Sequence, residues 1–126
     1  MSPKTYLDLA SWQRAMDLVS AVYETTRTWP RDELYGLTNQ IRRAAVSVPS
    51  NLAEGQGRNG DREFLQHLSI AHGSLREVET QLRIAARLGY LDQATLERLL
   101  SLCEQTGRPL RGLILRLREI KTVGSG

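Results

Sequence analysis

The chain has 126 residues, of which 40% are hydrophobic and 25% are charged, and its formal net charge is +3. This composition is typical of one ordinary folded domain and excludes a disordered or collagen-like chain. No apolar run approaches the ~18 residues of a membrane span, and the first residues lack the apolar segment of a secretory signal. Cys103 is the single cysteine, so no intrachain disulfide can form. Together these features predict a cytoplasmic protein with no membrane partner.

Apolar residues at helical spacing predict the first helix over residues 9–28. Pro30 cannot continue this helix and disfavours a helical conformation at Trp29. Asp32 is the expected N-cap of the second helix, which we predict over residues 32–55. The apolar stripe of the first helix is predicted to consist of Trp12, Ala15, Met16, Val19 and Tyr23.

The second helix ends in an unusual stretch, AAVSVPSNLAEGQGR, at residues 44–58. Pro49 lies beside the apolar stripe of this helix, where a proline removes one backbone donor. We therefore expect a kink that lets a long helix curve around the core. Gly55 and Gly57 are expected to supply the left-handed conformations of a helix exit.

The third helix is predicted over residues 60–88 by a seven-residue apolar repeat, which is typical of a helical bundle. Gly89 is its expected C-cap, and Asp92 is the expected N-cap of a fourth helix over residues 92–121. Gly107 and Pro109 are expected to bend that fourth helix. The repeat of the third helix is Phe64, Leu68, Ala71, Leu75, Val78, Leu82 and Ala85.

These elements predict an all-α protein with no convincing strand. Short connections make neighbouring helices antiparallel, so the expected fold is an up-down-up-down four-helix bundle over residues 9–121. Residues 1–8 are an expected N-terminal extension, and residues 122–126 an expected flexible tail. The core-facing seam of the fourth helix is predicted to be Leu96, Leu99, Cys103, Thr106, Leu110, Leu113, Leu117 and Ile120.

The sequence offers no arrangement typical of an enzyme. The Glu-x-x-His motif of di-metal bundles is missing, and no phosphate-binding glycine fingerprint follows a strand. His67 and His72 are five residues apart, about 140° around a helix, so one face cannot present both to a metal ion. Cys103 occupies a seam position, where a cysteine behaves as a small hydrophobe. We therefore predict no catalytic residue, no metal and no cofactor, and a protein that is not an enzyme.

Arginine supplies fifteen of the seventeen basic residues, and residues 108–121 carry five basic side chains against Glu119 alone. Three of these arginines fall within an arc of about 80° on the predicted fourth helix. Such a stripe could follow a phosphate backbone. The alternative is a solvated face, or arginines paired with Glu97 and Glu104. The stripe consists of Arg108, Arg111 and Arg118, with Leu115 among them.

The second helix carries a polar stripe on the side away from its predicted core. Arg43 and Glu54 on this stripe are about 16 Å apart along the axis, so they cannot pair within one helix. They could pair across a subunit boundary, and a solvated face is the alternative. Leu100 and Leu115 lie off the seam of the fourth helix and favour self-association. The candidate oligomer-interface residues are therefore Ser47, Ser50, Glu54, Leu100 and Leu115.

Residues 34–58, LYGLTNQIRRAAVSVPSNLAEGQGR, resemble the signature of a family of bacterial four-helix-bundle proteins. That family was first noticed as reading frames within intervening sequences of large-subunit ribosomal RNA genes. Residues 64–91 are similar to the family's third helix and its turn. The resemblance implies a four-helix bundle, a ring of five subunits and no established activity. It also implies that the family repeats the positions of Arg42, Arg43, Pro49, Asn51, Glu54, Gly55, Gly57 and Arg58.

A more distant similarity is to the accessory proteins of diversity-generating retroelements, which are basic pentameric bundles that bind a reverse transcriptase and nucleic acid. The leading hypothesis is therefore a non-catalytic homo-oligomer that binds nucleic acid, foremost RNA, through arginine side chains. The alternative is a protein-interaction scaffold or accessory subunit for a reverse transcriptase or another mobile-element enzyme. The candidate nucleic-acid-binding residues are Arg42, Arg43, Arg58, Arg108, Arg111 and Arg118.

Overall fold

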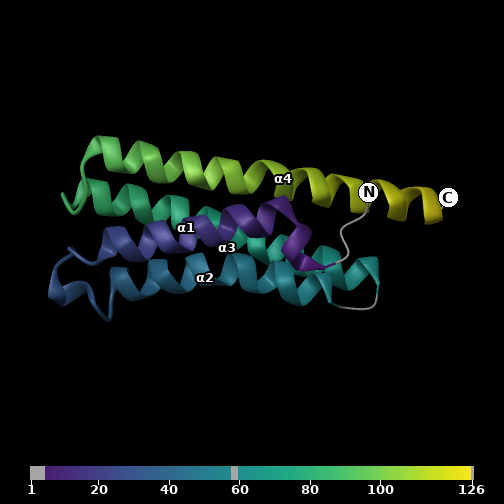
Figure 1. Ribbon diagram of the computed structural model, residues 1–126, viewed down its shortest axis with the longest axis horizontal. Helices are drawn as coiled ribbons and strands as arrows, with labels where there is room; N and C mark the ends of the chain where they lie inside the picture. Colours follow the sequence, from purple (N-terminus) through teal and green to yellow (C-terminus); the bar gives the residue numbers. More distant parts are fainter. Residues whose placement is uncertain (1–4, 58–59, 126) are drawn as a thin grey trace.

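The computed structural model of the protein describes the backbone of residues 5–57 and 60–125 and the side chains up to residue 119 within them. The described residues form helices joined by turns, without a strand, as predicted (Figure 1). None of its helices is both long enough and apolar enough to cross a membrane. The elements are η1 (Tyr6–Asp8), α1 (Ala10–Thr26), η2 (Arg31–Glu33), α2 (Leu37–Gln56), α3 (Asp61–Arg87) and α4 (Gln93–Ser125).

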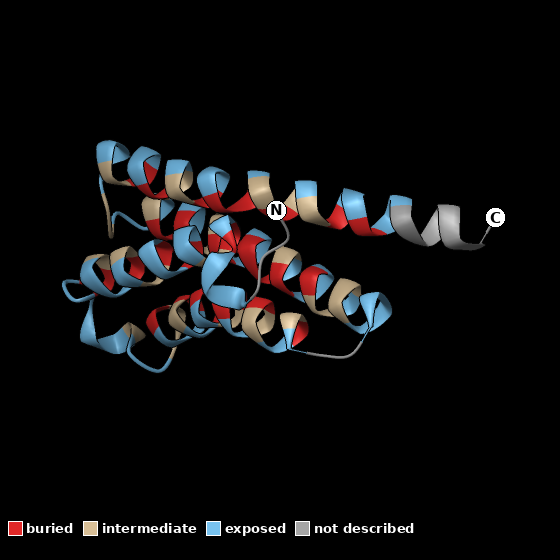
Figure 2. Cartoon of the chain, turned by 45° about the vertical axis from the view of Figure 1, so that its right-hand side comes forward, coloured by how far each residue is buried: buried red, intermediate tan, exposed pale blue. Residues whose placement is uncertain are grey.

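The four long helices form a bundle in which each helix packs against two others. α1 packs against α2 and α4, and α3 packs against the same two helices. Short connections reverse the chain between successive helices, so neighbours run antiparallel (Figure 1). The predicted four-helix bundle is therefore confirmed. Figure 2 shows the buried residues on the inner sides of the helices and the exposed residues on the outer sides.

The α3 repeat is buried as its sequence predicts. From Leu68 to Ala85 the repeat positions are at most 2% exposed, and Phe64 is half-buried at the start of the helix. Ser74, which the repeat does not include, is buried as well. A narrow seven-residue repeat fixes the inward face of a helix because only one rotation about its axis buries the whole stripe.

The α4 seam is buried as predicted from Leu96 to Leu110. Beyond it, Ile114 is buried while Leu113 is half-buried, and the side chain of Ile120 lies outside the described residues. α4 stays one continuous helix through Gly107 and Pro109 and runs to Ser125.

The predicted stripe of α1 was only partly correct: Ala15 is buried, and Trp12 and Val19 pack against the core. The buried residues of this helix are Ser11, Ala15, Leu18, Val22 and Thr26. Met16 is 42% exposed instead, and Tyr23 is exposed too. The reason is that apolar residues cover a broad arc of α1, so their pattern alone cannot decide which half of the arc faces the core.

The glycines at the end of α2 do not play the predicted role. Gly55 lies inside the helix, and Gly57 at its end has a φ of −80°, which any residue can adopt. Gly60, with a φ of 119°, supplies the positive φ just before α3. Gly89, with a φ of 79°, follows α3 as predicted.

Two carboxylates cap the helices that follow the turns at one end of the bundle. Asp92 Oδ1 accepts a hydrogen bond from the Thr95 amide at 2.8 Å, as its predicted capping role requires. Asp32 does not cap α2; Glu33 Oε1 accepts from the Leu37 amide at 3.2 Å. The Tyr90 hydroxyl donates to Glu33 Oε2 at 2.7 Å. The hydrogen bond from Tyr90, and to a smaller extent that from the Leu37 amide, lowers the pKa of Glu33. The bond from Tyr90 also joins the loop before α2 to the turn after α3.

Candidate nucleic-acid interface

The arginine stripe of α4 lies beside one carboxylate. Arg111 Nη2 is 2.9 Å from Glu104 Oε1, and Arg108 Nη2 is 3.7 Å from the same oxygen. Two guanidinium groups thus share a single negative charge. All three side chains remain partly exposed, and exposed ion pairs contribute little because water screens them. These pairs therefore leave both arginines able to meet another anion.

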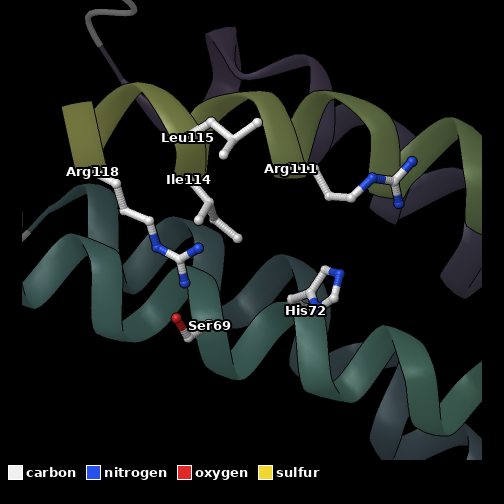
Figure 3. Close-up of a pocket in the computed structure, with 6 residues that line it drawn as sticks. All are labelled: Ser69, His72, Arg111, Ile114, Leu115 and Arg118. Carbon is white, nitrogen blue, oxygen red and sulfur yellow. The ribbon is translucent and has the colours of Figure 1, made fainter.

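Two adjoining hollows run between α3 and α4, with cavity volumes of about 420 and 490 Å³. They share Ser69 and Arg118, so we treat them together as the α3–α4 groove. The first is lined by Ser69, His72, Arg111, Ile114, Leu115 and Arg118 (Figure 3). The second adds Arg62, Leu65, Gln66 and Ile70.

The α3–α4 groove is positively charged. Arg62 lines it from α3, and Arg111 and Arg118 line it from α4. Arg111 and Arg118 are seven residues apart, about 10.5 Å along the helix axis. None of the described residues that line the groove is a carboxylate. Figure 3 shows Arg118 reaching from α4 toward Ser69 on α3.

His72 stands inside this groove. Its half-buried imidazole points from α3 into the space beneath α4 (Figure 3). Burial lowers the pKa of His72, and the neighbouring guanidinium groups of Arg76, Arg111 and Arg118 lower it further, while Glu79 acts in the opposite direction. The ring is therefore mostly neutral at pH 7.

A polar seam joins α2 to α3 on another side of the bundle. The hydroxyls of Ser47 and Ser74 are 2.8 Å apart. The Asn51 amide nitrogen donates to Ser47 O at 2.9 Å and to Ser47 Oγ at 3.0 Å. The Asn51 carbonyl oxygen is then left to accept from His67 Nδ1 at 3.0 Å. Gly55 completes this close contact, because a Cβ at that position would lie 2.5 Å from the Cβ of His67.

A model of the 23S rRNA-intervening sequence protein family matches residues 7–112. This match covers most of the chain and all of α1, α2 and α3. The chain belongs to this family. A search of curated proteins found no match to the chain. The family match includes His72 and Arg111 but ends before Leu115 and Arg118, so part of the α3–α4 groove lies beyond the matched residues.

Arg42, from the stretch that resembles the family signature, holds α2 against α1. Its Nε donates to Thr26 Oγ1 at 2.8 Å, and its guanidinium carbon lies 4.7 Å from the centre of the Tyr23 ring. Arg43 is exposed and lines a separate polar hollow between α2 and α3. Arg58 lies outside the described residues. The structure therefore does not bring Arg42 and Arg43 into the groove that holds Arg111 and Arg118.

Pro49 contributes to an apolar hollow between α1 and α2. α2 continues through this proline without a break, and the proline is buried. The hollow has a volume of about 390 Å³, and none of the described residues that line it is charged. Its lining is Tyr6, Trp12, Met16, Val19, Val46, Pro49, Ser50 and Ala53.

The candidate oligomer-interface residues are spread over several sides of the bundle. Ser47 lies in the α2–α3 seam, whereas Ser50 is exposed beside the apolar hollow. Glu54 is exposed near the end of α2. Leu100 is half-buried and packs against the core, and Leu115 is 59% exposed in the α3–α4 groove. These five residues do not share one face.

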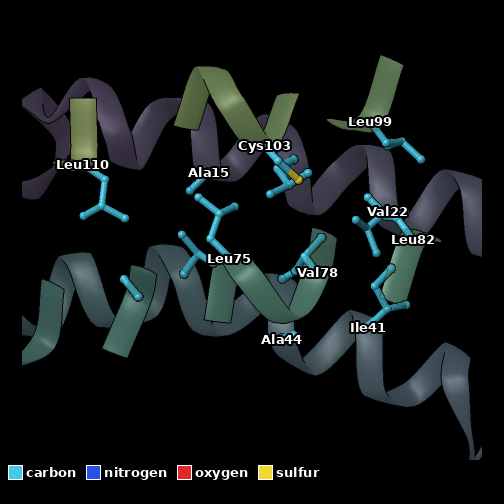
Figure 4. Close-up of a cluster of buried hydrophobic side chains, with 14 of the residues drawn as sticks. Ala15, Val22, Ile41, Ala44, Leu75, Val78, Leu82, Leu99, Cys103 and Leu110 are labelled. Carbon is cyan, nitrogen blue, oxygen red and sulfur yellow. The ribbon is translucent and has the colours of Figure 1, made fainter. Parts of the chain in front are cut away.

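Cys103 lies within the hydrophobic core (Figure 4). Burial, with a smaller contribution from Glu79, raises the pKa of its thiol to about 12. Because the thiolate is the reactive form, this cysteine is unsuited to act as a nucleophile at neutral pH. The described residues include no group of three or more His, Cys, Asp or Glu side chains that could hold a metal ion.

Arg62, Ser69 and His72 were not predicted from the sequence as site residues. A signal for two of them was present, because Ser69 and His72 are three residues apart and therefore share one side of α3. Their meeting with Arg111 and Arg118 depends on how far α3 is shifted along α4. The structure sets this shift by placing Leu75 against Gly107.

Proposed function

We propose that this chain is a non-catalytic, homo-oligomeric helical bundle that binds nucleic acid, foremost RNA, through the α3–α4 groove. The observation that carries this proposal is the placement of Arg62, Arg111 and Arg118 along one groove without a carboxylate among its described lining residues. A guanidinium group matches the geometry of a phosphate and keeps its charge at any physiological pH. Membership of a family encoded in 23S rRNA intervening sequences favours RNA over other anions.

The proposed contacts are with phosphates rather than with bases. The described lining of the groove contains no Phe, Tyr or Trp side chain on which a base could stack. Exposed Arg108 extends the positive surface along α4, whereas Arg43 lines the separate hollow between α2 and α3. We leave Arg42 out, because Thr26 and Tyr23 already hold its guanidinium group. A reducing cytoplasm is part of the proposal, since it suits a chain whose one cysteine is free.

Removing both groove arginines of α4 is expected to weaken RNA binding. In Arg111→Gln/Arg118→Gln, the dissociation constant for a dye-labelled RNA hairpin should rise about ten- to hundredfold at low salt, because two charge-assisted hydrogen bonds are lost. The slope of log K against log salt should also fall by about 2. Fluorescence anisotropy over a series of salt concentrations measures both quantities.

The matched control is Arg14→Gln/Arg31→Gln, which removes the same net charge from exposed positions on α1 and η2. We expect this variant to bind the hairpin almost as tightly as the unchanged protein. Equal weakening in the two variants would show that net charge alone attracts RNA. Binding that is absent at low salt, or insensitive to salt, would contradict the proposed function itself.

A second candidate function is a scaffold or accessory subunit for a reverse transcriptase or another mobile-element enzyme. It is favoured by Ile70 and Leu115, whose exposed apolar side chains lie beside the groove arginines. Apolar residues flanked by arginines suit an acidic amphipathic helix of a protein partner. Association with such an enzyme that survives nuclease treatment, in a chain that does not bind RNA, would favour this function.

The proposed oligomer uses the apolar hollow between α1 and α2, and the resemblance to the family implies a ring of five subunits. Met16 in this hollow is 42% exposed, beside residues that carry no charge. Met16→Glu should therefore cost at least about 2 kcal/mol of association free energy, because the carboxylate would be buried without a partner. Light scattering at several protein concentrations would then detect smaller particles.

Ile84→Glu is the matched control for Met16→Glu. Ile84 is 41% exposed, but it lies on α3, which packs against α2 and α4. We expect this variant to assemble like the unchanged protein. Dissociation by Ile84→Glu but not by Met16→Glu would move the subunit interface to α3.

A further inference from the structure

Among the described residues that line the groove, His72 is the one whose charge changes near neutral pH. It lies one helical turn from Ser69 on α3, and the two side chains line the same hollow as Arg111 and Arg118. A ligand phosphate that occupies this hollow would therefore meet the imidazole together with the guanidinium groups. The same hollow leaves the ring half-buried, so an imidazolium ion would lose part of its hydration there.

The charged groups that face the imidazole come from both helices of the groove. α3 supplies Arg76 and Glu79, and α4 supplies Arg111 and Arg118. Three positive charges against one negative charge disfavour the imidazolium ion while the groove holds no anion. Each phosphate brings one negative charge, which offsets this repulsion and can accept a charge-assisted hydrogen bond from the protonated ring.

We propose that His72 is a proton-dependent phosphate ligand of the α3–α4 groove, so that RNA binding is accompanied by uptake of one proton at this ring. This inference rests on the proposed function. In mildly acidic solution the groove then holds RNA more tightly, because His72 adds a positive charge that the groove lacks at higher pH.

The direction of the pH dependence follows from the two protonation states. In the free protein the pKa of His72 is lowered, and a bound phosphate raises it. Between the free and the bound pKa, RNA binding takes up a proton, so affinity rises as the pH falls through this interval. Above both pKa values the ring stays neutral and affinity no longer depends on it. Phosphodiesters keep their single charge throughout, so the ligand itself contributes no titration.

The test is the affinity for a dye-labelled RNA hairpin, measured by anisotropy at constant ionic strength between about pH 5.5 and about pH 8. The unchanged protein should bind about three- to tenfold more tightly at the lower pH, which corresponds to a pKa shift of up to about one unit. His72→Gln should bind with nearly the same affinity at both ends of the range. At the higher pH it should match the unchanged protein, because a neutral ring and an amide are both uncharged.

His67→Gln is the control, because the chain has only two histidines and His67 lies in the α2–α3 seam. This variant should keep the pH dependence. The two variants also assign the two imidazole signals in proton NMR spectra, and the His72 pKa should rise when the hairpin saturates the protein. This second readout does not depend on the affinity itself.

Each result decides between the two proposals. RNA binding with no pH dependence, a dependence that persists in His72→Gln, or a His72 pKa that RNA leaves unchanged would overturn the role of His72 and leave the proposed function standing. Failure to bind the hairpin at any pH would overturn both. Binding of poly-glutamate in place of the hairpin would overturn both as well and favour the protein scaffold.

Discussion

Replacing Leu110 with alanine is expected to lower the free energy of unfolding by about 2–5 kcal/mol. Leu110 is 0% exposed at the centre of the α4 seam, where it lies among buried side chains of the neighbouring helices (Figure 4). The change removes apolar contacts and leaves a cavity that close-packed helices fill only in part. Urea denaturation followed by circular dichroism measures the loss.

Leu115→Ala provides the matched control for Leu110→Ala. It removes the same atoms from the same helix, but this leucine is 59% exposed. Its expected cost is below about 0.5 kcal/mol. Both variants must be compared at one protein concentration, because assembly would add a concentration-dependent contribution to stability. Equal losses would show that α4 is rotated about its axis relative to the seam described above.

The sequence predicts the rotation of a helix well only where its apolar stripe is narrow. The α3 repeat is a single line of residues, and every member from Leu68 to Ala85 is buried. α1 instead has apolar residues over a broad arc, with Leu18 and Val22 at one edge and Met16 and Tyr23 at the other, about 130° away. Which edge of this arc faces inward is set by the packing of α1 against α2 and α4, and Ala15 lies between the two edges. No periodicity within α1 contains that information.

The candidate site was predictable only in its charges. The excess of arginine on α4 is visible in the sequence, and Arg111 and Arg118 do line a groove. Their meeting with His72 requires the relative positions of two helices, which the sequence does not state. Arg42 shows the opposite case, because the sequence made it a candidate nucleic-acid-binding residue. The structure shows that Thr26 and Tyr23, on a different helix, hold it in place.

The stretch that resembles the family signature acts largely through helix packing in this chain. Arg42 and Pro49 lie on the side of α2 that faces α1, whereas Asn51 and Gly55 lie against α3. These residues fix how α2 sits between its two neighbours. The proposed RNA site lies across the bundle on α3 and α4. In this chain, therefore, the signature specifies the scaffold, and the charges that define the proposed function lie mostly outside it.

Gly55→Ala is expected to lower the free energy of unfolding by about 1–3 kcal/mol, although alanine favours a helix by about 1 kcal/mol over glycine. A Cβ at this position would lie 2.5 Å from His67 Cβ and 3.1 Å from Phe64 Cδ1. A Cβ is fixed to the backbone and cannot rotate away, so α2 and α3 must separate. Their separation would also stretch the hydrogen bond between Asn51 and His67. Urea denaturation measures the net effect.

Gly57→Ala is the control, two residues away in the same stretch. A Cβ at Gly57 would have its nearest neighbours at 3.6 and 3.7 Å, and its φ is already suited to alanine. We expect this change to leave stability unaltered or to raise it by up to about 1 kcal/mol. Adding His67→Gly to Gly55→Ala removes the opposing Cβ, so the double variant should be more stable than the sum of the two single effects predicts. If Gly55→Ala proves as stable as Gly57→Ala, α2 and α3 are not in this close contact, and the packing role assigned to Gly55 fails.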